Sequence, residues 1–464
     1  MGHRLSFDSL DKRRKESTGP WLSGVLAEAG VGDAEWIASV DYRPPMGHVS
    51  LRLEGDIPDS HLERLNSAPS IESVKRHGPF INLWVSAQSA ALETERDKPL
   101  VGYRVAVEHT SITPCYPINL ATSRSTVVGE QLRRCLSLLG ADVGAHFWLE
   151  ENARQTQVIS VGQCVRSLSS HGKADHVVGS IFRSGLGESF HSSRRLFSGA
   201  HQSARGAFGK RGRPYLKKDV REVAIAYLES MRYLGVREIQ FDLEREVLSS
   251  TAWPALIDRL SREKDFPGSV DGVLSVSTSR PRYLVRSLIY YSFLLAKYEL
   301  VLSVVPLRQY PTLSVASTFA QRVNDRTAQL RLLYYGDVTV DGERDSIRQG
   351  RFHSIDDLQK NDPSRLERLR LSFLSRRIGS CIDIGGTLDA PVSNVRGRVA
   401  KAAPDIACAI LLDEFKGCAL QFVLTGNYSS VLRWTADARL LLSGSKERQT
   451  VKSAELARVV TILG

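Results

Sequence analysis

A cluster of polar residues follows a β-branched run early in the chain. The run YRVAVEH includes Glu108, and Ser111 and Thr113 come directly after it. Asn119 and Thr122 follow at the start of a helical pattern. Carboxyl, hydroxyl and amide groups of this kind hydrogen-bond small polar ligands. Because ligands of parallel α/β sheets bind beyond the carboxyl ends of the strands, we expect a ligand site here.

A second chemical feature is a basic segment, residues 192–221. It carries nine Lys or Arg residues and one acid, Asp219, with Phe197, Phe208 and Tyr215 among them. Cations bind phosphates, and aromatic rings stack on bases. We predict an arm that binds nucleic acid, and the alternative is a basic loop without a specific partner. The residues predicted to bind are Arg194, Arg195, Arg205, Lys210, Arg211, Arg213, Lys217 and Lys218.

The elements that would position the first site follow a strand–helix–strand order. YRVAVEH is typical of a buried parallel strand, TVVGEQLRRCLSLLG has apolar residues at helical spacing and ends at Gly140, and ADVGAHFWL is a second strand candidate. Further helices and strands are expected in EVAIAYLESMRYLG, VREIQFDL and YLVRSLIYYSFLLAKYELVLSVV. The pattern predicts an α/β domain built from parallel βαβ units.

The two ends of the chain have different patterns. INLWV alternates and would close a small α+β module, and the polar stretch ETERDKP that follows is a plausible linker. From about residue 364 the pattern is mostly helical. We therefore predict three domains, which the length of 464 residues allows. They cover residues 1–98, residues 99–363 with the basic insertion near 192–221, and residues 364–464.

Composition restricts the class of protein. Lys plus Arg exceeds Asp plus Glu by 62 to 51, a net charge of +11 that favours a polyanionic partner. No apolar run reaches the length of a membrane span, and the first residues lack a secretory pattern, so we expect a cytoplasmic protein without a membrane partner. The six cysteines include no CxxC pair and no clustered histidines. We expect buried free thiols and no metal site.

Several segments together resemble arginyl-tRNA synthetase, a class I aminoacyl-tRNA synthetase. EHTSITP, with the PINLATSRS that follows, is similar to VEHTSxNPxGPLHIGHxRN, and HGPFINLWVS is similar to GPGFINF. GKADHVVGSIF resembles KxDHYxGxxY, YLVRSLIYY resembles YxxRDxAYH, SIDDL resembles TLDDL, and RLRLSFLSR resembles ALRxxLLSR. These segments keep the family order across nearly the whole chain. We expect His176, in DHVVG, to lie in a strand and to serve packing or hydrogen bonding.

The resemblance implies an architecture and a set of ligands. The fold would be an α/β, Rossmann-like class I catalytic domain with a small α+β tRNA-binding domain before it and an all-α anticodon-binding-like domain after it. An active member would use ATP with Mg²⁺, and the partner would be tRNA. Arg396 and Arg398, where the family's anticodon-binding helices begin, keep basic charge for that role.

The family's phosphate-binding motif is altered in this chain. Aligned on Pro117, the two histidines of HIGH become Asn119 and Thr122, and its Gly becomes Ala121. Asn and Thr can donate hydrogen bonds, but neither carries the positive charge that stabilises a developing phosphate charge. The methyl group of Ala121 could obstruct a base that stacks on the backbone.

Other implied site positions are altered as well. The signature loop aligns with Arg344, Ile347 and Arg348, so that its lysine becomes Ile347. The YxxRD motif keeps Tyr283 but has Ser287 in place of the acid that would hold the guanidinium of arginine. The residues that the resemblance places in or near the substrate pocket are Glu108, Ser111, Thr113, Glu151, Gln155, Glu246, Tyr283 and Ser287.

Three hypotheses follow. The first is a degenerate arginyl-tRNA synthetase-like protein that has lost arginine adenylation and acts by binding tRNA or an active synthetase. The second is an active ATP-dependent aminoacyl-tRNA ligase, for arginine or for another amino acid. The third is a scaffold that binds only protein. The first is favoured, because several phosphate- and arginine-binding positions have changed together. The sequence does not define an oligomeric state.

Overall fold

The architecture is that of a computed structural model. The residues that it describes are 6–15, 20–31, 36–42, 48–86, 89, 98–112, 116–149, 173–187, 213–250, 255–256, 259–260, 262, 283–324, 328–344, 352–384, 404–444 and 451–463. The chain forms two compact units. Unit 1 comprises 1–103, 134–142 and 391–464, and unit 2 comprises 104–133 and 143–390. A division into three domains is not tested by these units, so the boundaries at 98/99 and 363/364 stay a prediction.

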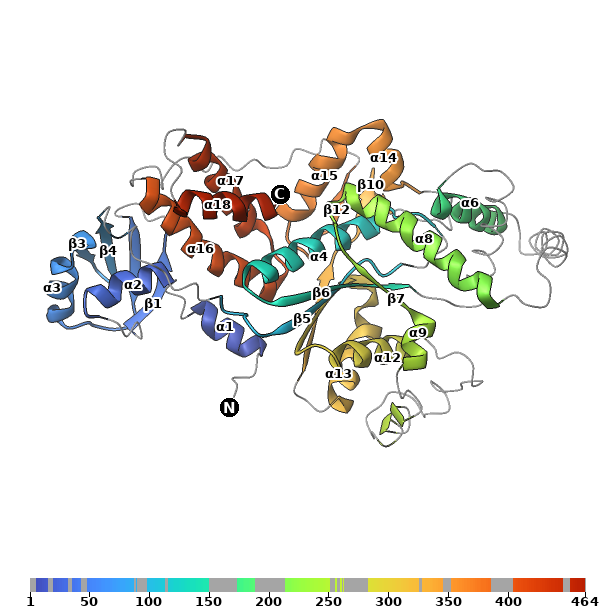
Figure 1. The fold of residues 1–464 in the computed structure, drawn as a ribbon, viewed down its shortest axis with the longest axis horizontal. Helices are drawn as coiled ribbons and strands as arrows, with labels where there is room; N and C mark the ends of the chain where they lie inside the picture. Colours follow the sequence, from blue (N-terminus) through green and yellow to red (C-terminus); the bar gives the residue numbers. More distant parts are fainter. Residues whose placement is uncertain are drawn as a thin grey trace. The chain divides into compact units, whose positions relative to one another are not determined.

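Unit 2 is built on a parallel sheet (Figure 1). Its strand order is β7-β6-β5-β8-β9, and the pairs β6–β7, β5–β8 and β8–β9 are parallel. In Figure 1, α4 lies on one side of the sheet and α12 and α13 lie on the other. The elements are β5 (Arg104–Glu108), α4 (Leu120–Leu138), β6 (Asp142–Leu149), β7 (Gln240–Leu243), α12 (Tyr283–Leu295), β8 (Leu300–Pro306) and α13 (Tyr310–Val323), with β9 (Gln329–Tyr335) at the edge.

Further elements complete unit 2. They are α6 (Ala174–Gly187), α8 (Arg213–Tyr233), α9 (Glu244–Ser250), the 3₁₀ helix η3 (Leu307–Gln309), β10 (Val338–Val340), β11 (Glu343–Arg344), α14 (Ile355–Asn361), α15 (Pro363–Ser375) and β12 (Ile382–Asp383). The three shortest strands form a second sheet in the order β11-β10-β12.

The predicted βαβ unit is present, for local reasons. The apolar residues of α4 at helical spacing, Val127, Val128, Leu132 and Leu136, are buried. The helix stops at a left-handed glycine, Gly140, whose φ is 96°. The middle of β5, residues 105–107, and most of β8 are apolar and buried, as expected for strands with both faces covered.

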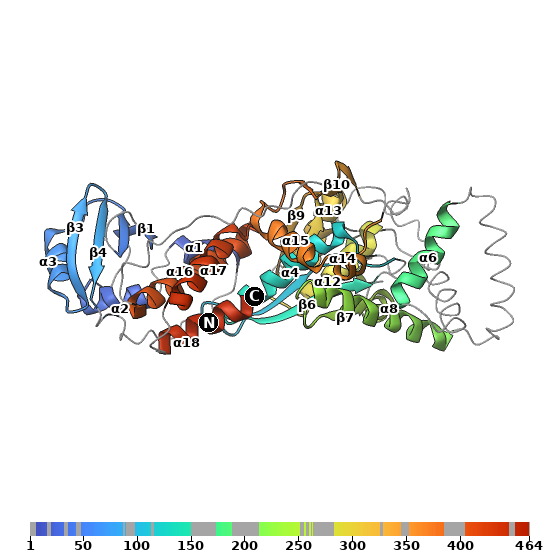
Figure 2. The same cartoon turned by 90° about the horizontal axis from the view of Figure 1, so that it is seen from above.

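Unit 1 combines a four-stranded antiparallel sheet with helices from the other end of the chain. The sheet order is β1-β2-β4-β3. Its elements are α1 (Phe7–Lys15), α2 (Pro20–Glu28), β1 (Ile37–Asp41), β2 (Val49–Leu53), α3 (Asp59–Ser67), β3 (Ile71–His77), β4 (Phe80–Val85), α16 (Pro404–Thr425), α17 (Ser429–Gly444) and α18 (Val451–Leu463). Figure 2 shows α16, α17 and α18 side by side.

A buried acid joins the two parts of unit 1. The carboxylate of Asp413, on α16, accepts hydrogen bonds from the backbone N–H groups of Trp21 (3.3 Å) and Leu22 (3.4 Å) and from the hydroxyl of Tyr42 (3.1 Å). Apolar residues of α16 join the core of the sheet and α2. Helix α16, near the end of the chain, therefore completes the core of the first module.

Two sequence-based expectations need correction. His176 lies in the helix α6, not in a strand, although the two valines that follow it favour a strand when taken alone. Among the four described cysteines, Cys381 is exposed, whereas Cys135 and Cys408 are buried as expected. Cys115 and Cys164 lie outside the described residues.

Candidate functional site

A cavity of about 120 Å³ opens at the carboxyl ends of the parallel strands of unit 2. Its wall combines residues from five places in the chain: Glu108 at the end of β5, Thr122 on α4, Trp148 on β6, Ser287 on α12 and Arg308 directly after β8. Of the pocket residues predicted from the sequence, Glu108, Ser111, Tyr283 and Ser287 lie on this wall. Trp148, Tyr290, Tyr291 and Arg308 also line it, and the sequence pattern alone gave no reason to place the three aromatic residues there.

The carboxyl group of Glu108 is buried and held by two serines. The hydroxyls of Ser111 and Ser303 donate to its two oxygens, and its exposed fraction is 2%. Burial raises the pKa of Glu108 above its usual range, although the serine hydrogen bonds oppose the shift. The acid is therefore a weaker cation-binding group than an exposed glutamate.

A strained turn places Ser111 beside Glu108. Thr110 has a φ of 63°, which is unusual for a β-branched residue. Its hydroxyl oxygen lies 2.6 Å from Nδ1 of His109 and 2.6 Å from the hydroxyl oxygen of Thr126. Burial lowers the pKa of His109 to about 4, so its imidazole is neutral near pH 7. A neutral hydrogen-bonded network thus holds the turn.

The helix terminus that corresponds to HIGH is occupied by its own cap. Oδ1 of Asn119 accepts the backbone N–H of Thr122 at 2.8 Å, and Oγ of Thr122 accepts the backbone N–H of Asn119 at 3.2 Å. This is a reciprocal capping arrangement. The N–H of Leu120 donates to the carbonyl of His353 at 3.2 Å, and that of Ser123 donates to the carbonyl of Asn119. Several donors that a phosphate could use at a helix N-terminus are therefore already bonded.

Ser287 does not supply a charge to the cavity. Its hydroxyl donates to the backbone carbonyl of Tyr283, one helical turn earlier, at 2.9 Å, and the residue is buried. Glu246 is exposed on α9 and does not line the cavity. The nearby buried acid, Glu244, forms two hydrogen bonds with Arg286 and is neutralised by it. The acid on the described wall is Glu108, and both of its carboxyl oxygens already accept hydrogen bonds from serines.

The residues that align with the family's signature loop follow β10. Arg344, on β11, forms an ion pair with Asp337 at 2.6 Å and is exposed. The segment after the loop pairs with the start of α4, since Asn119 and Ser354 form a β-bridge and the N–H of Ile355 donates to the carbonyl of Ile118. The remaining loop positions, Ile347 and Arg348, lie outside the described residues.

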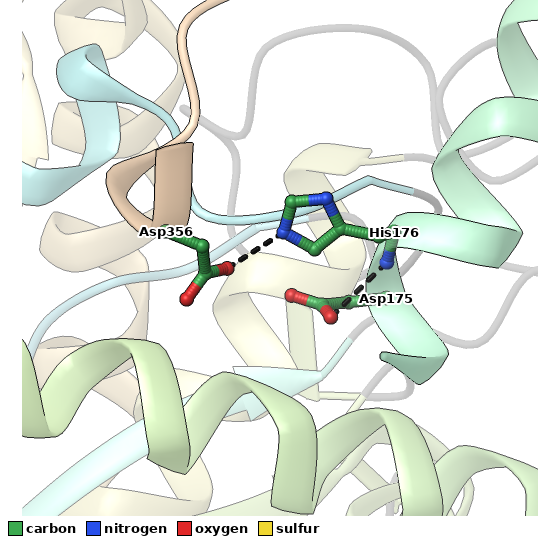
Figure 3. A group of neighbouring side chains, drawn as sticks. All are labelled: Asp175, His176 and Asp356. Atoms are coloured by element: carbon green, nitrogen blue, oxygen red, sulfur yellow. Dashed lines mark hydrogen bonds and ion pairs between the residues drawn. The ribbon is translucent and has the colours of Figure 1, made fainter. Parts of the chain in front are cut away.

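A polar cluster that was not predicted ties α6, α8 and α14 together (Figure 3). Nε2 of His176 lies 2.7 Å from Asp356, and Nζ of Lys173 lies 2.9 and 3.0 Å from the two oxygens of the same carboxylate. The hydroxyl of Ser230 donates to Asp356 as well. Burial opposes a charge on His176, but the hydrogen bond to Asp356 and the nearby acids outweigh it and raise the pKa.

The same cluster contains metal-ligand atoms. One such atom from each of Asp175, His176 and Asp356 lies within 4.8 Å of the other two. The ammonium of Lys173 is 2.9 Å from Asp356 and 3.6 Å from Asp175. Lys173 thus already provides the cation that balances these acids.

The sheet of unit 1 has one apolar face and one polar, aromatic face. Ile81, Leu83 and Val85 of β4 point into the core with α2 and α3, so the alternate residues Phe80 and Trp84 lie on the other face. Phe80 pairs across the strands with Arg52 and with His77, and the ammonium of Lys75 lies 5.2 Å from the centroid of the Trp84 ring. Phe80 is 41% exposed. We call Arg52, Lys75, His77, Phe80 and Trp84 the open sheet face.

Many of the residues predicted to bind tRNA or substrate lie outside the described residues, so their role stays a prediction. The backbone of Arg213, Lys217 and Lys218 lies in the first turns of α8. The predicted residues that lie outside the described parts of the chain are Thr113, Glu151, Gln155, Arg194, Arg195, Arg205, Lys210, Arg211, Arg396 and Arg398. No helix within the described parts of the chain is both long and apolar enough to cross a membrane.

Known proteins resemble the chain in both sequence and fold. No family model matches it. It is 26% identical over 120 residues to an arginine–tRNA ligase of Methanococcoides burtonii, a segment that covers 24% of this chain and 21% of that relative. It is 26% identical over 194 residues to that of Methanococcus maripaludis, covering 38% of this chain and 33% of the relative. The chain thus matches a third or less of these relatives' length.

The fold comparison extends over nearly the whole chain. Thermus thermophilus arginyl-tRNA synthetase matches with a TM-score of 0.64 and 16% identity, covering 96% of this chain and 97% of that one. This likeness confirms the predicted class I α/β fold. In both sequence and fold, the chain is thus similar to arginyl-tRNA synthetases.

Proposed function

We propose that this arginyl-tRNA synthetase-like protein binds tRNA and does not adenylate arginine. The observation that carries the second part is the Asn119–Thr122 cap. It occupies the backbone N–H groups of Asn119 and Thr122 at the position where the family's motif would meet a phosphate, and it adds no positive charge. Adenylation needs preorganised donors or cations at that point.

The arginine side of the reaction is affected independently. A guanidinium is bound well by an ionised carboxylate in a bidentate pair. Ser287 stands at the position of the family's acid and is hydrogen-bonded to its own helix. Burial keeps the pKa of Glu108 raised, so this remaining acid is a poor substitute. Binding of the arginine guanidinium and binding of the ATP phosphate are therefore both weakened at this cavity.

Support for RNA binding comes from the open sheet face. Exposed Phe80 and half-buried Trp84 offer aromatic surfaces, and Arg52 and Lys75 place positive charge beside them. Unstacked bases bind to such platforms, with the phosphates held by the cations. The net charge of +11 and the basic segment 192–221 favour the same kind of partner. We further propose a cytoplasmic location, where tRNA is found.

Pyrophosphate exchange tests the catalytic part. The full chain is incubated with ATP, labelled pyrophosphate and each amino acid in turn, beside an active arginyl-tRNA synthetase. We expect no arginine-dependent exchange. Arginine-dependent exchange at a rate comparable to the active enzyme would refute the loss of function. Exchange with a different amino acid would instead favour the second candidate, an active ligase, for which the cavity of unit 2 is the supporting observation.

Measuring tRNA binding at several salt concentrations tests the RNA-binding part of the proposal. The double variant Phe80→Ala, Trp84→Ala removes two stacking rings, and each stacked base contributes about 1–3 kcal/mol, so we expect affinity to fall by roughly 5- to 150-fold per base. Leu440→Ala, which truncates another exposed apolar side chain of unit 1, is the control. Equal affinity of the two variants would refute the open sheet face as the RNA site.

A charge variant tests the basic segment separately. Arg194, Arg195, Lys210, Arg211 and Arg213 are neutralised together. The slope of log K on log salt should flatten by about 0.7–0.9 for each phosphate that these cations neutralise in the wild type. An unchanged slope would remove the segment from the proposed interface. If the protein does not bind tRNA at any salt concentration, an active synthetase or another protein is the partner to test.

A further inference from the structure

Three side chains at the junction of α6 and α14 in unit 2 bring metal-ligand atoms together (Figure 3). One such atom from each of Asp175, His176 and Asp356 lies within 4.8 Å of the other two, and Nε2 of His176 is 2.7 Å from Oδ2 of Asp356. An imidazole nitrogen with two carboxylate oxygens is a donor set that Zn²⁺ binds. The ligand atoms of a tetrahedral Zn²⁺ lie about 3.4 Å apart, so small side-chain rotations suffice to enclose the ion.

The carboxylate of Asp175 is the least satisfied group in this cluster. Asp175 is 0% exposed, and its Oδ1 accepts the backbone N–H of His176 at 3.1 Å, but its Oδ2 has no hydrogen-bond partner among the described residues. Burial raises the pKa of Asp175, which means that its present contacts do not offset the cost of burying the charge. Because a buried acceptor without a donor is unfavourable, a cation in direct contact with Oδ2 is favoured.

Lys173 supplies its charge to Asp356 more closely than to Asp175. Its Nζ lies 2.9 and 3.0 Å from the two oxygens of Asp356 but 3.6 Å from Oδ2 of Asp175. It provides one positive charge for two carboxylates, and the second is present only when His176 is protonated. A divalent ion would provide both charges at one point, in contact with both acids.

The cluster is open to solvent on one side. The side chains of Lys173, His176 and Asp356 are 21%, 30% and 17% exposed. The ammonium of lysine is carried on a flexible stem of four carbons, so it can turn into the solvent while its charge stays hydrated. An ion can therefore enter and the lysine can leave without a change in the backbone.

We propose that Asp175, His176 and Asp356 form a site for one divalent transition-metal ion, Zn²⁺ or an ion of similar preference, which displaces the ammonium of Lys173. Nε2 of His176 and one oxygen of each carboxylate bind the ion, and a water molecule from the open side completes the tetrahedron. The ion joins α6 directly to α14. The site goes beyond RNA binding and the loss of adenylation, since it involves neither the open sheet face nor the cavity at the strand ends.

Zinc titration of the full chain, freed of metal with a chelator, tests the proposal. We expect the wild type to bind one Zn²⁺ ion that Asp175→Asn and His176→Gln each bind at least about tenfold more weakly, since even groups behind metal ligands contribute about tenfold or more. The control is Asp357→Asn, which changes the neighbouring acid on α14. That residue is exposed and its carboxylate accepts from Ser354, so this variant should bind Zn²⁺ as the wild type does. Zn²⁺ bound elsewhere, such as by cysteines, is common to all four proteins.

The absorption spectrum of bound Co²⁺ provides a second readout. Visible bands of tetrahedral Co²⁺ should appear with the wild type and with Asp357→Asn and should be lost with His176→Gln. Absence of Zn²⁺ binding by the wild type at millimolar concentration, or wild-type affinity of both Asp175→Asn and His176→Gln with their folds verified by circular dichroism, would overturn the proposal. Salt-dependent tRNA binding and pyrophosphate exchange are measured on the same His176→Gln protein and should match the wild type, so failure of the metal site is separable from failure of the proposed function.

Discussion

The titration of the Asp413 carboxyl group can be used to test how the two ends of the chain hold unit 1 together. It is 5% exposed and accepts hydrogen bonds from two backbone amides at the start of α2 and from Tyr42. Burial raises its pKa from 3.8 to about 6, against the opposing effects of Lys416 and of these hydrogen bonds. The perturbation is Asp413→Asn, which keeps the size and one oxygen acceptor but removes the titration.

The magnitude follows from linkage between protonation and folding. A folded-state pKa above the unfolded value means that the folded chain binds the proton more tightly, so stability is greatest below pH 3.8 and falls as the pH rises through about 6. A shift of about 2 pKa units corresponds to about 3 kcal/mol in the free energy of unfolding. About 2 kcal/mol of this change falls between about pH 4.5 and about pH 7.5.

The assay is urea denaturation of the wild type and of Asp413→Asn at both pH values. Other titrating groups are common to the two proteins, so their contributions cancel in the difference of unfolding free energies. We expect the variant to gain about 2 kcal/mol relative to the wild type as the pH is raised from about 4.5 to about 7.5. A difference that stays constant with pH, or that moves in the opposite direction, would refute the reasoning.

Three further predictions concern unit 2. Asn119→Ala removes the cap acceptor and should lower the free energy of unfolding by about 1 kcal/mol, measured by urea denaturation; no change would show that the cap is not stabilising. Ser287→Asp should bind arginine at least about a hundredfold more tightly than the wild type in calorimetry, because a buried carboxylate partner contributes on the order of 3–5 kcal/mol, whereas Ser287→Asn should not; equal binding by the two variants counts against the assignment. Lys173→Met should bind Zn²⁺ more tightly than the wild type, because Asp175, His176 and Asp356 lose their resident cation; titration that finds equal affinity would contradict this role.

The parts of the fold that could be predicted are those with a local cause. The helix α4 and the strands β5 and β6 follow from apolar spacing and from a glycine stop, and both patterns are readable over a few residues. The hydrogen-bonding role predicted for His176 is confirmed, but the strand predicted around it was wrong for a complementary reason. Its neighbours tolerate either a strand or a helix, and burial of Val178 against the rest of unit 2 comes from tertiary packing that no short window contains.

Some residues of the candidate site could be predicted from the sequence, and others could not. Glu108 and Ser111 could be placed in one site because ligands bind beyond the carboxyl ends of parallel strands, and Ser287 could be added because of the resemblance to the YxxRD motif. The Lys173–Asp356 pair could not, since its members are 183 positions apart and belong to elements with no shared pattern. The sequence marks Trp148 as an ordinary core residue, and only the structure shows that its N–H has no acceptor among the described residues.

The arrangement of unit 1 has a consequence for synthesis of the protein. Its sheet and α2 come from the first hundred residues, but α16, which completes their core, lies beyond the whole of unit 2 in the chain. On the ribosome, the N-terminal sheet, α2 and α3 therefore emerge with an apolar core that stays incomplete until Ala409 and Ile410 of α16 follow. The uncovered apolar surface of this core stays exposed for as long as unit 2 is being translated. During that time a chaperone has a surface to bind.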